Sequence, residues 1–182
     1  EPHAIWMGRL VPEKGPHLAI DAARAAGLPL KFAGPRSNPA YWDNEIAPRL
    51  GDDVTYLGHL GHDALAAQVA KAHVALCTPR WEEPFGLVLA EFLACGTPVA
   101  AFRRGAIPDI LDDSCGVLAA ADDVADLGRA VTQAITLSRA NCRRRAEQLF
   151  DADTMTDQYE ALYALELQRV ASTAITARAS NA

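Results

Sequence analysis

The sequence predicts an α/β fold: a doubly wound, Rossmann-like parallel sheet of about six strands with helices on both faces. Short apolar runs alternate with longer segments in which apolar residues recur at helical spacing, and this alternation is typical of parallel sheets. The connections between them are short and carry glycine or proline, as turns between such elements require. With 182 residues, half of them apolar, the chain is long enough for one domain with a sizeable core.

The expected strands are brief and mostly apolar, as in a sheet that is buried on both faces. Gly8, Gly34 and Gly58 follow the first three of them, where glycine permits a sharp change of direction. In such sheets ligands bind beyond the carboxyl ends of the strands, so these glycines mark the expected ligand edge. The strands are predicted at residues 4–7, 30–33, 54–57, 74–77, 99–102 and 116–118.

Helices are expected between the strands and after the last one. Pro16 favours a helix start and Gly27 a stop, because proline suits the first turn and glycine the left-handed residue that ends a helix. The other helices, apart from the one discussed next, are predicted at residues 40–47, 63–71, 126–137, 141–150 and 153–170. We therefore expect one domain over residues 1–170, with the small and polar residues 171–182 as a frayed tail.

The segment from Glu83 to Pro98 is the most informative stretch of the chain. A helix opens between Pro84 and Gly86, and Gly96 and Pro98 end it. Glu91 lies only ~7 Å along the helix axis from Gly86, at 1.5 Å per residue. The carboxylates of Glu83 and Glu91 are therefore both expected near the N-terminus of this helix. The N–H groups there favour an anion, whereas ionised carboxylates accept hydrogen bonds from hydroxyl groups. The pattern thus suits a ligand with phosphates and sugar hydroxyls, although two acids could also simply complement the helix dipole.

Two motifs resemble one enzyme family. Glu83-Pro-Phe-Gly-Leu-Val-Leu-Ala-Glu91, with Gly96-Thr-Pro-Val after it, closely resembles the Glu-x7-Glu region of retaining glycosyltransferases of family 4, which have the GT-B fold. Gly8-Arg9-Leu-x-Pro-Glu-Lys14-Gly15 resembles the segment with which that family holds the nucleoside diphosphate. The resemblance implies the C-terminal, donor-binding half of a GT-B enzyme, with the N-terminal acceptor domain absent from this chain.

The resemblance also implies catalytic roles for three side chains. Arg9 and Lys14 would hold the diphosphate, and fixed cations stabilise the negative charge that develops on a departing diphosphate. Glu83 would hold the hexose. The two cations take the place of a metal in this scheme, so neither a metal nor another cofactor is expected.

A second group of residues is implied to bind the donor. Glu91 would hold the ribose hydroxyls, while Gly8 and His59 would line the nucleotide pocket. The main-chain N–H groups that would contact the sugar and phosphates belong to Phe85, Gly86, Leu87 and Val88.

Composition and spacing disfavour several other classes of function. The net charge of −6 argues against a nucleic-acid-binding surface. His59 and His62 have His-x-x-His spacing but no third ligand near them in the sequence, so no metal site is predicted. No apolar run is long enough for a transmembrane segment. The four cysteines, Cys77, Cys95, Cys115 and Cys142, have no Cys-x-x-Cys spacing, which is typical of reduced thiols in a cytoplasmic protein. In its full-length form such a protein could also be peripheral to a membrane.

The leading hypothesis is a hexosyltransferase that moves a hexose with retention from a nucleoside-diphosphate sugar, a UDP-sugar being favoured, to an acceptor hydroxyl. The chain by itself is expected to bind this donor without transferring it, because transfer needs both substrates held in position. The alternatives are a GT-B nucleotide-sugar epimerase or phosphorylase, and a non-catalytic, flavodoxin-like nucleotide-binding module. A phosphate-receiver module would place acids after its first strand, where this chain has Gly8-Arg9.

Overall fold

The sheet has six strands, all parallel, in the order β3-β2-β1-β4-β5-β6. The computed structural model describes residues 2–179, and of residues 171–179 only the backbone. The predicted doubly wound fold is confirmed, and each strand lies within one residue of its expected bounds. The strands are β1 Ala4–Met7, β2 Leu30–Ala33, β3 Val54–Tyr56, β4 Val74–Cys77, β5 Val99–Phe102 and β6 Gly116–Ala119.

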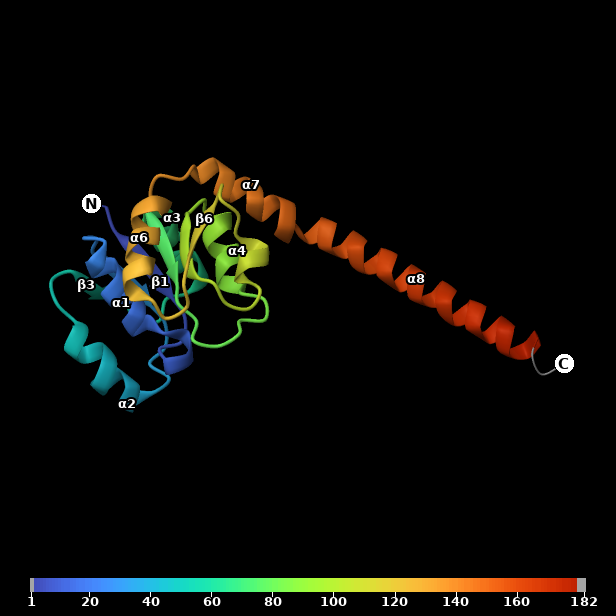
Figure 1. Ribbon diagram of the computed structural model, residues 1–182, viewed down its shortest axis with the longest axis horizontal. Coiled ribbons are helices and arrows are strands. Elements are labelled where there is room, and N and C mark those ends of the chain that lie inside the picture. Colours follow the sequence, from blue (N-terminus) through green and yellow to red (C-terminus); the bar gives the residue numbers. More distant parts are fainter. Residues whose placement is uncertain (1, 180–182) are drawn as a thin grey trace. The chain divides into compact units, whose positions relative to one another are not determined.

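Helices cover both faces of the sheet (Figure 1). α1 and α6 pack together over one face, and α3 and α4 pack over the other. A Cβ atom on Gly128 of α6 would lie only 3.0 Å from the Cβ of Ala25 in α1, so this glycine lets the two helices approach closely. The helices are α1 Pro16–Ala25, α2 Pro39–Tyr41, α3 His62–Lys71, α4 Leu87–Ala94, α5 Ile107–Ile110, α6 Val124–Ala134, α7 Arg139–Phe150 and α8 Ala152–Ala179.

The core follows from the composition of the strands. β1, β4 and β5 are buried along their whole length, as their uninterrupted apolar sequences predict for a sheet covered on both faces. Phe32, Phe92 and Phe102 are among the largest fully buried side chains. Together these residues hold the carboxyl ends of the central strands in a rigid frame, and that frame positions the loops described below.

Two helix predictions need correction. The helix expected at residues 40–47 begins instead as α2 and continues as a wider π turn, Trp42–Ile46, and a 3-10 turn, Ala47–Arg49. Pro48 has no N–H group to donate, so a regular α-helix cannot continue through it. The last helix does not end near residue 170, because α8 extends to Ala179 through an alanine-rich sequence of high helix propensity. The tail expected at residues 171–182 is therefore helical as far as it is described.

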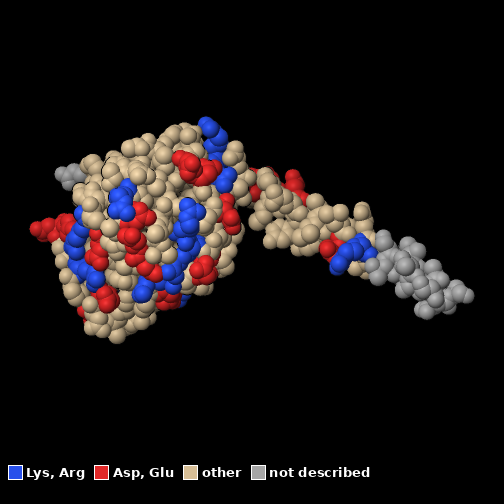
Figure 2. Space-filling model, viewed as in Figure 1, with Lys and Arg blue, Asp and Glu red and all other residues tan. Residues whose placement is uncertain are grey.

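The described residues divide into two compact units, one up to Glu147 and a second that begins at Gln148. In this second unit the side chains of α8 are exposed from Ala152 to Val170. Among the residues described, no helix combines the length and the apolar character that a membrane span requires. On the face of the molecule in Figure 2, basic and acidic side chains are interspersed rather than gathered into one basic patch.

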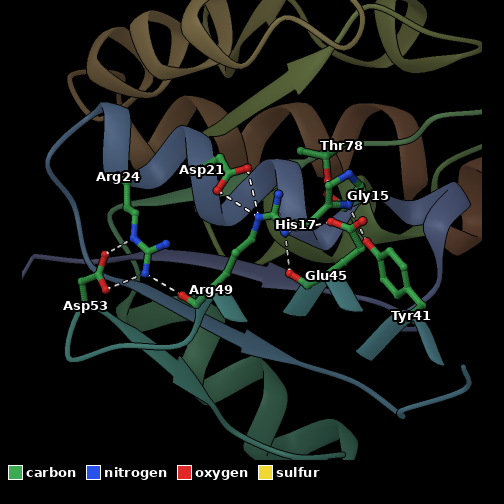
Figure 3. Close-up of polar contacts among 9 residues, drawn as sticks. All are labelled: Gly15, His17, Asp21, Arg24, Tyr41, Glu45, Arg49, Asp53 and Thr78. Atoms are coloured by element: carbon green, nitrogen blue, oxygen red, sulfur yellow. Dashed lines mark hydrogen bonds and ion pairs between the residues drawn. The ribbon is translucent and has the colours of Figure 1, made fainter. Parts of the chain in front are cut away.

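A network of polar contacts fastens the segment between β2 and β3 to α1 (Figure 3). Arg49 bonds to Asp21 of α1 at 3.2 Å and to Glu45 at 2.8 Å. Arg24, near the end of α1, forms a two-point contact with Asp53 at 2.6 and 2.9 Å, the geometry in which arginine binds a carboxylate best.

His17 and Tyr41 form a further contact of this network, with the imidazole Nδ1 against the tyrosine hydroxyl. Burial raises the pKa of Tyr41 to about 12. The hydroxyl therefore stays protonated and donates a hydrogen bond to a neutral imidazole. Burial and the nearby Arg49 lower the pKa of His17 below its ordinary value of 6.5, against the opposing effects of Glu45 and Asp21. The fold therefore favours neutral His17.

This lowered pKa predicts a loss of stability in mildly acidic solution. A histidine whose pKa is lower in the folded chain takes up a proton preferentially when unfolded. The contribution of neutral His17 to the free energy of unfolding is therefore complete above pH 6.5, and it is lost as the pH falls below that value. His17→Gln, which cannot titrate, should flatten the fall in unfolding free energy between about pH 7 and pH 5, measured by urea denaturation at each pH.

His62→Gln serves as the control, because His62 is an exposed histidine at the start of α3. The pKa values of four aspartates, Asp53, Asp112, Asp126 and Asp151, are lowered from the ordinary value of 3.8, so their effects on the unfolding free energy fall below the pH range of this test. A His17→Gln variant that keeps the full slope above pH 5 would contradict the assignment.

Candidate donor-binding site

A cavity of about 320 Å³ lies at the carboxyl ends of β1 and β2. Strand order reverses between β1 and β4, and this switch point is where ligands of open α/β sheets bind. Five of the residues singled out from the sequence line the cavity. Its lining is Met7, Gly8, Arg9, Ala33, Gly34, Pro35, His59, Leu60, Leu65, Val88 and Glu91.

The floor of the cavity requires glycine. Gly8 has φ 154° and Gly34 has φ 147°, and a Cβ atom on Gly34 would lie 1.8 Å from the carbonyl oxygen of Gly8. No side chain fits between two backbones at that distance. Glycine at these two positions therefore lets the ends of β1 and β2 lie in close main-chain contact where they line the cavity.

Lys14 and Glu83 are brought together in an ion pair beside this edge. The Lys14 Nζ atom lies 2.6 Å from Glu83 Oε2, and the indole N–H of Trp81 donates to the same oxygen at 3.1 Å. Lys14 also lies over the Trp81 ring, 5.0 Å from its centroid. Glu83 is 9% exposed, so this carboxylate is held in one place by two donors. The contact of Trp81 with Glu83 was not predicted, although the place of Trp81 directly before Glu82 and Glu83 in the sequence is a signal for it.

The loop that carries Glu83 rests against the loop after β5. The main-chain N–H of Ala106 donates to the carbonyl oxygen of Glu83 at 2.8 Å, and the N–H of Gly105 donates to the Glu82 carboxylate at 2.7 Å. Gly105 has φ 52°, and a Cβ atom there would lie 2.2 Å from the Glu83 carbonyl oxygen. Gly105 thus permits the contact that sets the backbone position of Glu83.

The start of α4 provides the expected helix mouth. Gly86 precedes the helix with φ 77° and contributes no side-chain cap, so no N-cap side chain occupies the first N–H groups of α4. Phe85 and Leu87, on either side of Gly86, are exposed at 50% and 70%.

The remaining predicted residues differ in how they are held. The Arg9 side chain is 60% exposed, and its nearest acidic partner, Glu13, is 3.9 Å away. Glu91 and His59 are also exposed on the cavity wall. The structure therefore places Arg9, Glu91 and His59 around one cavity, and it places Glu83 and Lys14 in the adjacent ion pair rather than in the cavity lining.

Thiol chemistry has no support at this site. Burial raises the pKa of Cys77, at the end of β4, to about 12, and that of Cys115 and Cys142 to about 11. Burial likewise raises the pKa of Cys95. A nucleophilic cysteine needs a lowered pKa, so the four thiols are packing residues. Within residues 2–179, no three His, Cys, Asp or Glu side chains are grouped so that they could hold a metal ion.

The fold and the cavity define an α/β domain that binds its ligand at the carboxyl edge of a parallel sheet. The family model of glycosyl transferases group 1 matches residues 1–149, and the chain belongs to this family. Similar proteins include the MMP alpha-(1->4)-mannosyltransferase of Mycolicibacterium hassiacum, 37% identical over 68% of this chain and 32% of the relative. The D-inositol 3-phosphate glycosyltransferase of Mycolicibacterium paratuberculosis is 33% identical over 87% of this chain and 39% of the relative.

Solved structures agree with this assignment. A glycosyltransferase involved in avilamycin A biosynthesis superposes with a TM-score of 0.81 at 28% identity, over 92% of this chain and 52% of the other. The chain spans about a third of the length of the curated relatives named above.

The contact at Gly105 yields a prediction with a matched control. Gly105→Ala and Gly27→Ala both place a side chain on a residue with positive φ, which costs about 1–2 kcal/mol. Only at Gly105 does the new Cβ meet backbone, whereas nothing lies within 4 Å at Gly27. We expect Gly105→Ala to lower the free energy of unfolding by about 2 kcal/mol more, because two hydrogen bonds to the neighbouring loop must break.

Urea denaturation of both variants measures the difference. Equal losses would show that the two loops adjust to the extra carbon without separating.

Proposed function

We propose that this chain is the donor-binding domain of a retaining glycosyltransferase that transfers a hexose from a nucleoside-diphosphate sugar to an acceptor hydroxyl. The observation that carries the proposal is the arrangement at the switch point. A cavity with Glu91 and Arg9 on its wall adjoins an ion pair of Lys14 and Glu83 and an uncapped helix start. These groups match, in turn, the parts of a nucleotide sugar.

The nucleoside fits the cavity. Its volume of about 320 Å³ is within the range of small-molecule sites, ~300–1,000 Å³. Ala33, Pro35 and Leu60 give it apolar walls that suit a base. An ionised Glu91 only accepts hydrogen bonds, so it suits the two hydroxyls of a ribose and repels a phosphate.

In this proposal the diphosphate is bound by the cations Arg9 and Lys14. Arg9 lies at the rim of the cavity and offers a fork of donors to phosphate oxygens. Lys14 carries three donors, so one can stay on Glu83 while another reaches a phosphate oxygen. The start of α4 adds main-chain donors and the positive end of the helix dipole. In this proposal these groups stabilise the leaving diphosphate, and no metal is required.

In this proposal Glu83 binds the hexose. Its carboxylate is fixed by Lys14 and Trp81 at 2.6 and 3.1 Å, and a fixed acceptor orients sugar hydroxyls without first having to be ordered. One relative is named a mannosyltransferase and another a glycogen synthase, and both names support a hexose. A UDP-sugar is the donor we favour, and a cytoplasmic enzyme is the setting.

Arg9→Ala tests the diphosphate assignment. It should weaken UDP binding by roughly 1.5–3 kcal/mol, the value of a hydrogen bond to a charged group, and leave uridine binding nearly unchanged. Titration calorimetry of both ligands measures the two effects, with Arg129→Ala on the surface of α6 as the control. Equal losses for UDP and uridine would sink the assignment.

Glu91→Ala should affect both ligands equally. The ribose is common to UDP and uridine, so the variant should weaken the binding of each by roughly tenfold, which corresponds to about 1.4 kcal/mol of lost hydrogen bonding. A thermal-shift panel of UDP, GDP and ADP with their sugar conjugates identifies the base in parallel. Glu160→Ala, an exposed acid on α8, is the control, and unchanged uridine binding by Glu91→Ala would remove Glu91 from the ribose site.

A further inference from the structure

A buried chain of hydrogen bonds runs beneath the loop that carries Arg9 and Lys14. The Trp6 indole N–H donates to the Thr78 hydroxyl oxygen at 3.0 Å. That hydroxyl has a single proton, and it faces two carbonyl oxygens, of Lys14 at 3.0 Å and of Gly15 at 2.9 Å. Trp6 and Thr78 are 2% and 1% exposed, so water does not compete for these groups. Figure 3 shows Thr78 directly beside Gly15.

Both ends of the loop, residues 8–15, pack against these two residues. At its start, a Cβ atom on Gly8 would lie 3.1 Å from the Trp6 ring. At its end, Gly15 has φ 63°, and a Cβ atom there would lie 2.3 Å from the Thr78 carbonyl oxygen. The N–H of Arg80 adds a hydrogen bond to the Glu13 carbonyl at 2.8 Å.

The loop has little internal structure to hold itself. Its one regular element is the 3-10 turn Pro12–Lys14, with main-chain bonds from Lys14 to Val11 and from Gly15 to Pro12 at 3.1 and 3.2 Å. A single turn is not stable alone, because fixing its dihedral angles costs more than its few hydrogen bonds return.

We propose that Thr78, supported by Trp6, is a positioning residue that sets where Lys14 meets the diphosphate. Thr78 directly follows β4 and lies on the same segment as Glu83, so its hydroxyl fixes the backbone of Lys14 relative to the segment that also carries the acidic partner of Lys14. The ligand in this inference rests on the proposed function, whereas the placement of the loop does not.

The competing interpretation is that the hydroxyl only satisfies buried polar groups, and valine separates the two. Thr78→Val keeps the shape of the side chain but leaves the Trp6 N–H and the Lys14 carbonyl without the partner described here. Thr78→Ser keeps the hydroxyl and should rescue both properties tested.

Thr97→Val is the matched control. Thr97 is also fully buried, and its hydroxyl donates to the main-chain oxygen of Val69 at 2.8 Å. It precedes β5, at the end of the sheet opposite the cavity. Thr97→Val therefore removes a comparable bond and reports what a purely structural defect does.

The experiment has two readouts on the chain as it stands. Titration calorimetry should show UDP affinity reduced about tenfold in Thr78→Val, uridine affinity unchanged, and both unchanged in Thr97→Val. Amide hydrogen exchange without ligand should show the Lys14 and Gly15 amides exchanging at least about tenfold faster in Thr78→Val, beyond any global change seen in Thr97→Val.

Each result decides between the two claims. Exchange at Lys14 and Gly15 that stays at the wild-type rate overturns the positioning role, as does a Thr78→Val chain in which UDP and uridine weaken together. If the wild-type chain binds no nucleoside diphosphate, the proposed function fails, and the exchange experiment still tests the placement of the loop. Should Thr78→Val not fold, Trp6→Phe gives the same two readouts, again compared with Thr97→Val, because it removes the indole N–H donor to Thr78 together with part of the buried ring.

Discussion

The ion pair between Lys14 and Glu83 is the contact on which the arrangement of the site depends, because it joins the loop after β1 to the loop after β4. Their side chains are 26% and 11% exposed and lie 2.6 Å apart. At an effective dielectric constant of 20 the attraction is about 6 kcal/mol, while removing each ion from water costs several kcal/mol. The two nearly cancel, so the pair adds little net stability. Its effect is geometric: it holds a cation and a carboxylate at fixed positions across the switch point of the sheet.

Much of the fold could be predicted because each strand has a simple local signal. A short apolar run followed by Gly8, Gly34 or Gly58 leaves little choice but a buried strand that ends at that glycine. Helix bounds depend more on context. Residues 42–49 form π and 3-10 turns, since Pro48 interrupts the α-helical pattern, and the Arg36 guanidinium stacks 3.6 Å from the centre of the Trp42 ring. Neither effect is visible in hydrophobic spacing.

The site was predictable only in part, for a related reason. Parallel strands bring their carboxyl ends to one edge, so residues following different strands, such as Arg9 and His59, were expected together, and the cavity unites them. The pairing of Lys14 with Glu83 was not foreseen, because it depends on how two loops fold back toward each other. The same holds for Trp81 and for the contact of Gly105 with the Glu83 carbonyl. Loop conformation is decided by tertiary contacts that sequence spacing does not report.

The glycines and the charges of the site support one another. Gly34 lets the ends of β1 and β2 approach closely. The cations Arg9 and Lys14 by themselves would attract many small anions. The carboxylates Glu91 and Glu83 oppose that, since each repels a free phosphate while accepting hydrogen bonds from hydroxyls. Under the proposed function, these cations and carboxylates together favour a ligand that combines an anionic part with hydroxyl-rich parts. A nucleoside-diphosphate sugar has that distribution of charge, and inorganic phosphate does not.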